Sequence, residues 1–178
     1  MKKTTVLKGR IIVIKDENGK SIDDIDTDMI FHNKHLHITD INEMGQYAFG
    51  NLQGWENFSK TVKSGDILVV GKNFGAGSSR QQAVDCFRAL GIQMIIGESF
   101  GAIYKRNAIN SGMPLMTAQE IMNEDIKTDD IIKVNLQTGE IFNITENQSL
   151  KAATPLSKVQ LDIYQAGTLF EYGRNLRQ

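Results

Sequence analysis

The stretch GKNFGAGSSR, residues 71–80, combines three glycines with two serines and an arginine. Glycines let a backbone turn sharply and approach another group closely. Hydroxyl groups suit the binding of a carboxylate or phosphate, and an arginine can hold a carboxylate through two parallel hydrogen bonds. We therefore interpret Gly75 and Gly77 as an anion-binding turn, with Ser78, Ser79 and Arg80 beside it.

This turn lies between a predicted strand and a predicted helix. DILVV (66–70) is a short apolar run rich in β-branched residues, which is typical of a buried strand. Apolar residues then recur at helical spacing from Ala83 to Leu90, and Gly91 ends the pattern. In an open parallel sheet, ligands bind beyond the carboxyl ends of the strands, where helix N-termini attract anions. The turn occupies a position of that kind.

A purely structural role for the turn is one alternative. Ser78 and Gln81 match a capping box, in which the two side chains cap the start of a helix. Arg80 argues against capping alone, because an arginine in the first helical turn opposes the helix dipole. The stretch departs from the dinucleotide-binding and P-loop motifs, since arginine stands where the third glycine of G-x-G-x-x-G belongs and no Gly-Lys-Ser/Thr ending follows. A non-catalytic anion- or nucleotide-binding module is the second alternative.

The elements around the turn predict an α/β fold in a single domain, residues 1–178. Strands that alternate with helices indicate a parallel sheet with right-handed crossovers. We expect strands within 6–31 and at 66–70, 92–96 and 113–116, helices near 42–49 and at 83–90, 100–108 and 157–165, and a hairpin over 130–145 that turns at Thr138-Gly139.

The composition is that of an ordinary globular protein. The 178 residues are 40% hydrophobic and 23% charged, with a formal net charge of −1. Because there is no basic block and no acidic tail, we expect neither a nucleic-acid nor a membrane partner. The apolar run near the N-terminus, Ile11 to Ile14, is too short for a signal peptide or a membrane helix, so we expect a cytoplasmic location.

The central part of the sequence closely resembles a known family. Residues 71–116, with the motifs GAGSSR and IYKRNAINSGMP, are similar to the small subunits of 3-isopropylmalate dehydratase and their relatives, the swivel-domain half of the aconitase family. The likeness continues in DDIDTDMIF upstream and in KAATPLSKVQLDIYQAGTLFEYG downstream. It implies an aconitase-type β/β/α swivel domain, with a short parallel sheet, crossover helices and additional β-hairpins.

The resemblance also implies an enzyme that works with a partner. Members of this family close over a large subunit that carries a [4Fe-4S] cluster, and the pair isomerises a hydroxy acid by dehydration and rehydration. We favour a 3-isopropylmalate dehydratase, a hydro-lyase that converts 2-isopropylmalate to 3-isopropylmalate in leucine biosynthesis. The small subunit of a homoaconitase, or of another substituted-malate hydro-lyase, is the alternative within the same chemistry.

Individual residues match the family's motif. The resemblance assigns Ser78 as the catalytic base, and Ser79, Arg80 and Asp28 as substrate-binding residues. A serine can act as a base where backbone N–H groups and a helix N-terminus stabilise its alkoxide, and the glycines of the turn expose such groups. The family's substrate-specificity loop falls on four residues: Lys34, His35, Leu36 and His37.

The sequence departs from the family's pattern at a few positions. Gln81 and Gln82 stand where the family often has Glu-His, and Ala76 stands where many microbial members have cysteine. None of these changes removes a catalytic or substrate-binding group named above. In the loop, His35 replaces a frequent tyrosine, and this change leaves the exact substrate undecided.

We expect the [4Fe-4S] cluster in the large subunit, and we expect this chain to bind no cofactor. Iron–sulfur clusters are held by several thiolates, and Cys86 is the only cysteine. Its place within a helix predicts a core residue. The histidines at 32, 35 and 37 have no carboxylate cluster nearby, so we expect no metal site. Arg106, on the second predicted helix, either supports the site or forms a surface ion pair.

Overall fold

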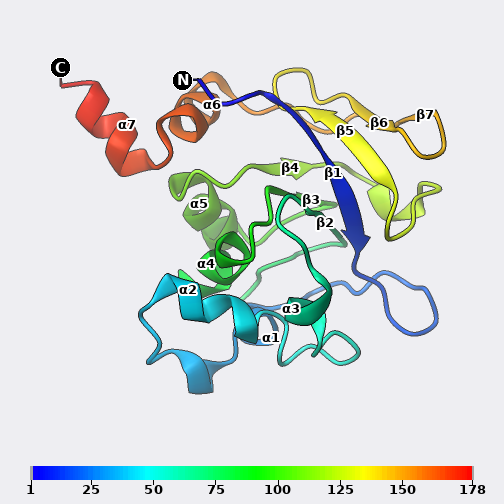
Figure 1. Ribbon diagram of the computed structural model, residues 1–178, viewed down its shortest axis with the longest axis horizontal. Coiled ribbons are helices and arrows are strands. Elements are labelled where there is room, and N and C mark those ends of the chain that lie inside the picture. The colour runs from blue at the N-terminus through cyan, green and yellow to red at the C-terminus, as the bar shows by residue number, and fades with distance from the viewer. Residues whose placement is uncertain (1, 178) are drawn as a thin grey trace.

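The centre of the computed structural model, which describes residues 2–177, is a curled seven-stranded sheet (Figure 1). The strand order is β4-β3-β2-β1-β5-β6-β7, with β1 to β4 parallel and β5 to β7 antiparallel. The strands are β1 (Val6–Val13), β2 (Ile67–Val70), β3 (Met94–Gly97), β4 (Leu115–Thr117), β5 (Ile131–Asn135), β6 (Ile141–Asn143) and β7 (Gln148–Leu150).

Strand β1 joins the two halves of the sheet. Its first residues, Val6 to Arg10, pair with β5, and its last residues, Ile11 to Val13, pair with β2. Parallel strands need long crossover connections, and helices α4 and α5 lie in two of them. The helices are α1 (Thr27–Ile30), α2 (Ile41–Met44), α3 (Phe58–Thr61), α4 (Gln82–Ala89), α5 (Ala102–Asn110), α6 (Lys158–Ala166) and α7 (Leu169–Asn175), with short 3-10 turns η1 (Asn33–His35), η2 (Gly45–Tyr47) and η3 (Ile121–Asn123).

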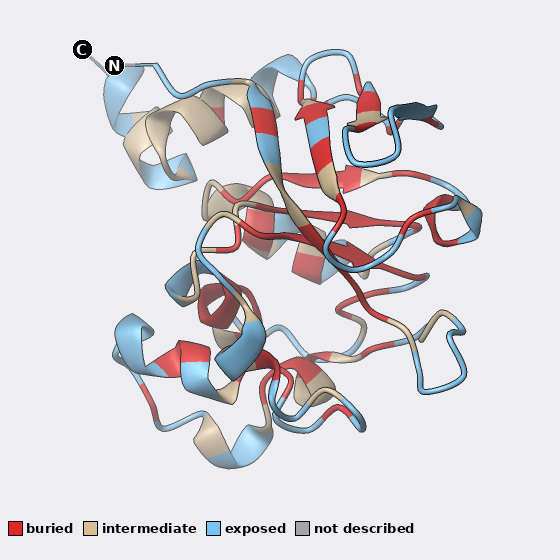
Figure 2. Cartoon of the chain, turned by 45° about the vertical axis from the view of Figure 1, so that its right-hand side comes forward, coloured by how far each residue is buried: buried red, intermediate tan, exposed pale blue. Residues whose placement is uncertain are grey.

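The sheet separates two apolar cores, because successive strand residues point to opposite faces. Leu68 and Val70 of β2 lie in the core beneath α1 to α5, whereas Ile67 and Val69 lie in the core beneath η3, α6 and the antiparallel strands. All four residues of β2 are buried, and Figure 2 shows the same pattern through the neighbouring strands. None of the helices within residues 2–177 is long and apolar enough to span a membrane.

The sequence-based expectations hold for most of this architecture. The parallel strands, helices α4 and α5, the hairpin between β5 and β6, and helix α6 are confirmed. The expectation of strands within 6–31 is confirmed only for β1, since no further strand follows in that range and Thr27–Ile30 forms helix α1. The Asp26 side chain caps this helix by accepting a hydrogen bond from the Met29 N–H at 2.8 Å. Helix α7 and strand β7 were not expected.

The alternative of a capping box at Ser78 is contradicted by the structure. Helix α4 begins at Gln82, and no side chain caps it. A capping box is present instead at the start of α6, where Ser157 and Gln160 cap each other's backbone. Ser78 therefore belongs to the turn before the helix, and capping does not explain its presence there.

We predict that Gly75→Ala destabilises the protein strongly. Gly75 has a φ of +78°, and a Cβ there would overlap the buried ring of Tyr104. Left-handed strain and overpacking together should cost roughly 2–6 kcal/mol of the free energy of unfolding, measured by urea denaturation. Gly54→Ala is the matched control, because Gly54 has a φ of +85° but open space around it. Equal losses in the two variants would show that the turn relaxes away from Tyr104.

Candidate active site

The turn after β2 is fixed by contacts on both sides. Phe74 is buried at its start, and the Gly75 N–H donates a hydrogen bond to the Ile25 carbonyl at 2.8 Å. The Thr27 N–H donates to the Ala76 carbonyl at 2.9 Å. These two bonds hold the turn directly against the start of α1, although more than forty positions separate the two segments in the sequence. Residues that follow the turn therefore lie close to residues of α1.

The tip of the turn presents polar groups to solvent. Gly77, Ser78 and Ser79 are exposed, and their backbone N–H groups donate to no acceptor within residues 2–177. The Ser79 hydroxyl accepts a hydrogen bond from the Asn107 side-chain amide of α5 at 3.3 Å. The Ser78 hydroxyl has no hydrogen-bond partner in the described part of the chain. The arrangement provides N–H donors next to a hydroxyl group, and the binding of an anion at this turn stays a prediction.

Arg80 and Asp28 form an ion pair at this place. The Arg80 Nη1 donates to Asp28 Oδ1 at 2.8 Å and to the Phe31 carbonyl at 3.1 Å. The Arg80 side chain is only 14% exposed, so it is held in place, whereas the Asp28 side chain is 37% exposed. The hydrogen bond from Arg80 is the largest cause that lowers the pKa of Asp28 below its ordinary value, and the Asn33 N–H adds to it.

Only one nitrogen of the Arg80 guanidinium is used in these contacts. Both bonds involve Nη1, and within residues 2–177 neither Nε nor Nη2 donates to a protein group. Nε and Nη2 form one edge of the planar guanidinium, with the geometry that binds a carboxylate through two parallel bonds. Asp28 thus orients Arg80 without occupying that edge.

The four residues of the predicted specificity loop have different environments. Lys34, Leu36 and His37 are exposed, whereas His35 is half-buried. The His35 ring stacks on Tyr47 with ring centres 3.9 Å apart and an angle of 23° between the planes. His35 therefore anchors the loop to η2, and its three neighbours are left facing solvent.

The loop also contacts the beginning of helix α4. The Gln82 side-chain amide donates to the Leu36 carbonyl at 3.4 Å. Because Gln82 follows Arg80 by two residues, this contact brings the loop next to the turn. The structure therefore gathers the turn, the Arg80–Asp28 pair and the specificity loop on the same side of the molecule as α1 and α2.

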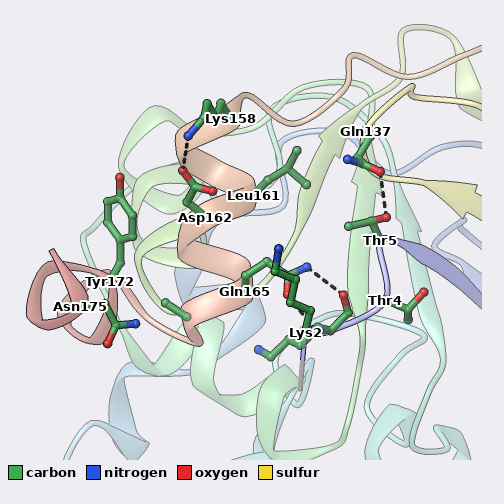
Figure 3. A pocket seen from close by; sticks show the side chains of 12 residues that line it. Lys2, Thr4, Thr5, Gln137, Lys158, Leu161, Asp162, Gln165, Tyr172 and Asn175 are labelled. Atoms are coloured by element: carbon green, nitrogen blue, oxygen red, sulfur yellow. Dashed lines mark hydrogen bonds and ion pairs between the residues drawn. The ribbon is translucent and has the colours of Figure 1, made fainter. Parts of the chain in front are cut away.

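A large surface cavity lies elsewhere. Its volume is about 770 Å³, and it is bounded by the N-terminal residues, α6 and α7 (Figure 3). Neither the turn nor the loop contributes a residue to its lining. Lys158 and Asp162 at its rim form an exposed ion pair with each other, so this cavity offers no arrangement comparable to that at Arg80. The residues that could perform chemistry lie on an open face of the chain.

The protein-family model of the aconitase C-terminal domain matches residues 17–120, which include the turn, the Arg80–Asp28 pair and the loop. The chain belongs to the aconitase C-terminal domain family. Three curated relatives agree over most of its length. A homoaconitase small subunit of Methanocaldococcus jannaschii is 38% identical and covers 90% of this chain and 91% of the relative.

The other two relatives have different names. An isopropylmalate/citramalate isomerase small subunit of Methanocaldococcus jannaschii is 40% identical, with 90% of this chain and 93% of the relative covered. A 3-isopropylmalate dehydratase small subunit of Caldicellulosiruptor bescii is 37% identical, with 90% and 95% covered. The chain is thus a member of the isopropylmalate isomerase and homoaconitase group of small subunits within the aconitase C-terminal domain family.

A solved structure confirms the expected fold class. The crystal structure of 3-isopropylmalate dehydratase from Methanocaldococcus jannaschii superposes with a TM-score of 0.84, at 35% sequence identity, and covers 97% of this chain and 95% of that one. The mixed α/β architecture with a short parallel sheet and added antiparallel strands is therefore that of the aconitase C-terminal domain family. The roles assigned to Ser78, Ser79, Arg80 and Asp28 stay predictions.

The donor set of this family member does not fit an iron–sulfur cluster. Cys86 is completely buried in α4, as predicted for a core residue, and burial raises the pKa of its thiol far above the ordinary range. Within residues 2–177 no group of three His, Cys, Asp or Glu side chains is placed to hold a metal ion. Arg106 is exposed on α5 and forms no ion pair with a described residue, so the ion-pair interpretation has no support there, and a role at the site stays a prediction.

Three groups near the site were missed by sequence analysis. These are the Phe31 carbonyl, the Asn107 side chain that binds Ser79, and the Asn51 side chain, whose amide donates to Asp28 Oδ2 at 3.2 Å. A carbonyl gives no sequence signal, and asparagines are common in loops. The position of Asn107 inside the motif IYKRNAINSGMP was the one available indication.

We predict that His35 titrates below its ordinary pKa of 6.5, because its burial and the nearby charges of Lys34, His32 and His37 disfavour the imidazolium. The unfolded chain then binds a proton more readily than the folded chain. As the pH falls through 6.5 towards the folded pKa, His35 should therefore lower the free energy of unfolding. An NMR titration of the His35 ring measures the midpoint, and Tyr47→Ala should move it back towards 6.5. A wild-type midpoint at or above 6.5 would contradict this account.

Proposed function

We propose that this chain is the small subunit of a hydro-lyase that converts 2-isopropylmalate to 3-isopropylmalate by dehydration and rehydration. The observation that carries the proposal is the guanidinium edge of Arg80, which is oriented by Asp28 next to exposed N–H and hydroxyl groups of the turn. Membership of the small-subunit family supports the reaction class. The reaction would belong to leucine biosynthesis. We also propose that the subunit is a single domain and is located in the cytoplasm.

The reaction requires a base for a weakly acidic proton. Dehydration removes a proton from the carbon next to a carboxylate and a hydroxide from the neighbouring carbon, and rehydration adds water back with the two positions exchanged. Ser78 is the proposed base. Its alkoxide would be stabilised by the exposed N–H groups of Gly77, Ser78 and Ser79, which compete with no protein acceptor within residues 2–177.

Arg80 and Ser79 are proposed to hold the substrate. The Nε and Nη2 edge of Arg80 matches the two oxygens of a carboxylate, and a bidentate pair fixes orientation as well as binding. The Ser79 hydroxyl is already oriented by Asn107, so it can offer its proton to a second substrate oxygen. Both groups follow Ser78 within two residues of the sequence, and the carbon next to the bound carboxylate would therefore lie close to the base.

A large partner subunit is a necessary part of the proposal. The proposed site lies on an open face, whereas enzymes usually exclude water from such chemistry. We propose that the partner closes this face and carries the [4Fe-4S] cluster, since the described side chains offer no ligand set for it. No nucleic acid and no membrane takes part.

Homoaconitase chemistry is the second candidate, because one relative is a homoaconitase small subunit. A tricarboxylate would prefer a fixed cation in the specificity loop, and Lys34 and His37 are exposed there. Leu36 is 38% exposed between them, and an apolar side chain suits the isopropyl group. We favour the alkyl substrate for that reason. His35 does not favour either candidate, since its ring is stacked on Tyr47.

The proposal is tested by reconstitution. The purified chain is mixed anaerobically with the cluster-bearing large subunit from the same organism, and conversion of 2-isopropylmalate is followed. Activity is expected only in the mixture. Ser78→Ala should lower kcat by at least about 100-fold, because removing a general base costs that much or more. It should leave the urea midpoint unchanged, because Ser78 caps no helix.

Each result in this experiment has a defined meaning. Thr138→Ala in the β5–β6 turn is the matched control for loss of one exposed hydroxyl, and it should keep full activity. Near-normal turnover by Ser78→Ala would refute its role as base. An inactive mixture that still binds phosphate or a carboxylate at the turn would favour the alternative of a non-catalytic anion-binding module.

Leu36→Ala tests the choice between the two substrates. Losing the apolar contact should lower kcat/KM for 3-isopropylmalate by about 10- to 100-fold, with little effect on homoaconitate, because isopropyl-sized contacts are worth roughly 1–3 kcal/mol. Val159→Ala, which removes an exposed side chain on α6, is the control. An unchanged ratio of the two efficiencies would place specificity outside the loop.

A further inference from the structure

Asp28 is held from two sides. Its Oδ1 accepts from Arg80 Nη1 at 2.8 Å and from the Asn33 N–H at 2.9 Å. Its Oδ2 faces the side-chain amide of Asn51, with a hydrogen bond of 3.2 Å. The same Asn51 nitrogen also donates to the backbone carbonyl of Asp28 at 3.3 Å. One amide therefore links the carboxylate of Asp28 to the backbone of the same residue.

This double contact restricts the rotamer of Asp28. A carboxylate on a short side chain can rotate about χ1 between staggered positions. In the rotamer observed, one Asn51 amide bonds both Oδ2 and the carbonyl of Asp28 while Oδ1 accepts from Arg80, and rotation about χ1 would carry the carboxylate away from these donors. Asn51 is neutral, so it orients the carboxylate without replacing Arg80 as the ionic partner.

The backbone that presents Asn51 is strained. Phe49, two residues earlier, has a φ of +57°, which is an outlier for a bulky residue. Such conformations persist where the surroundings fix them, and they cluster at functional sites. The Phe49 ring is buried, with ring centres 4.9 Å from Phe58 and 5.0 Å from Phe87.

Backbone hydrogen bonds fix the segment 49–52, which carries Asn51. The Phe49 N–H donates to the Ile30 carbonyl of α1 at 2.8 Å, and the buried Leu52 donates its N–H to the Phe49 carbonyl at 3.0 Å. Asn51 is itself exposed, yet anchored residues lie on either side of it. Segment 49–52 is thus tied to α1, the element that carries Asp28. The whole segment between α2 and α3 lies beside α1 (Figure 1).

We propose that Asn51 is a positioning residue that locks the Asp28 carboxylate, and through it Arg80, in the orientation needed to bind the substrate carboxylate. The proposal rests on the function proposed above for Arg80. Its geometric part, the locking of Asp28 by Asn51, concerns the isolated chain and can be measured there.

The first experiment uses the isolated full chain. The carboxyl group of Asp28 is titrated by carbon-detected NMR in wild type, Asn51→Ala and Asn57→Ala. Asn57 is the matched control, because it is exposed in the same segment and its side chain makes no capping bond. We expect the pKa of Asp28 to rise in Asn51→Ala and to stay unchanged in Asn57→Ala, with equal urea midpoints. An unchanged Asp28 pKa in Asn51→Ala would overturn the proposal.

The second experiment uses the reconstituted complex. Asn51→Ala should raise the KM for 2-isopropylmalate about tenfold, as expected for loss of one hydrogen bond to a charged group, and change kcat less than threefold. Asn51→Asp, which keeps the shape but repels Asp28, should raise KM further. Unchanged KM values in both variants would overturn the link to substrate binding. If the wild-type complex is inactive, the function proposed above fails, and the NMR titration still decides whether Asn51 positions Asp28.

Discussion

The turn and helix α5 approach each other too closely for any side chain at Gly75. The ring of Tyr104 fills the space that a Cβ would need, and its hydroxyl donates to the Ala83 carbonyl of α4 at 2.9 Å. One buried ring thereby connects the turn, α5 and α4. Gly101 is constrained from the other side, since a Cβ there would lie 2.7 Å from the Gly75 carbonyl oxygen. The position of the proposed base at Ser78 depends on this contact.

The sequence predicts the layer of the fold that contains α4 and α5 because each of these elements buries a continuous apolar face. Helix α1 has only four residues, too few for a helical period, and its Asp26 cap is an ordinary acidic residue until the chain is folded. The pattern of Ser78 and Gln81 satisfies the local rule for a capping box, yet it does not cap α4. Bonds from the turn to Ile25 and Thr27, which are not local, hold this segment in a different conformation.

The candidate site likewise depends on contacts between residues that are distant in the sequence. Arg80 and Asp28 lie 52 positions apart, and periodicity cannot pair residues over that distance. Arg80 was conspicuous because an arginine fits poorly beside a helix N-terminus, and Asp28 came only from the family resemblance. Asn51 lies in the least regular segment, where neither a period nor a motif singles it out. Its role follows from a backbone conformation at Phe49 that a sequence does not reveal.

Cys86 has a consequence for experiments on this chain. It is the only thiol in the sequence, it is completely buried in α4, and burial keeps it protonated. Because the thiolate is the form that reacts with alkylating reagents, the folded protein is protected, and labelling requires α4 to separate from the sheet. At reagent concentrations where closing is faster than labelling, the labelling rate therefore reports the free energy of local opening in the layer that supports Arg80. The chain contains its own probe of rigidity, which needs neither substrate nor partner.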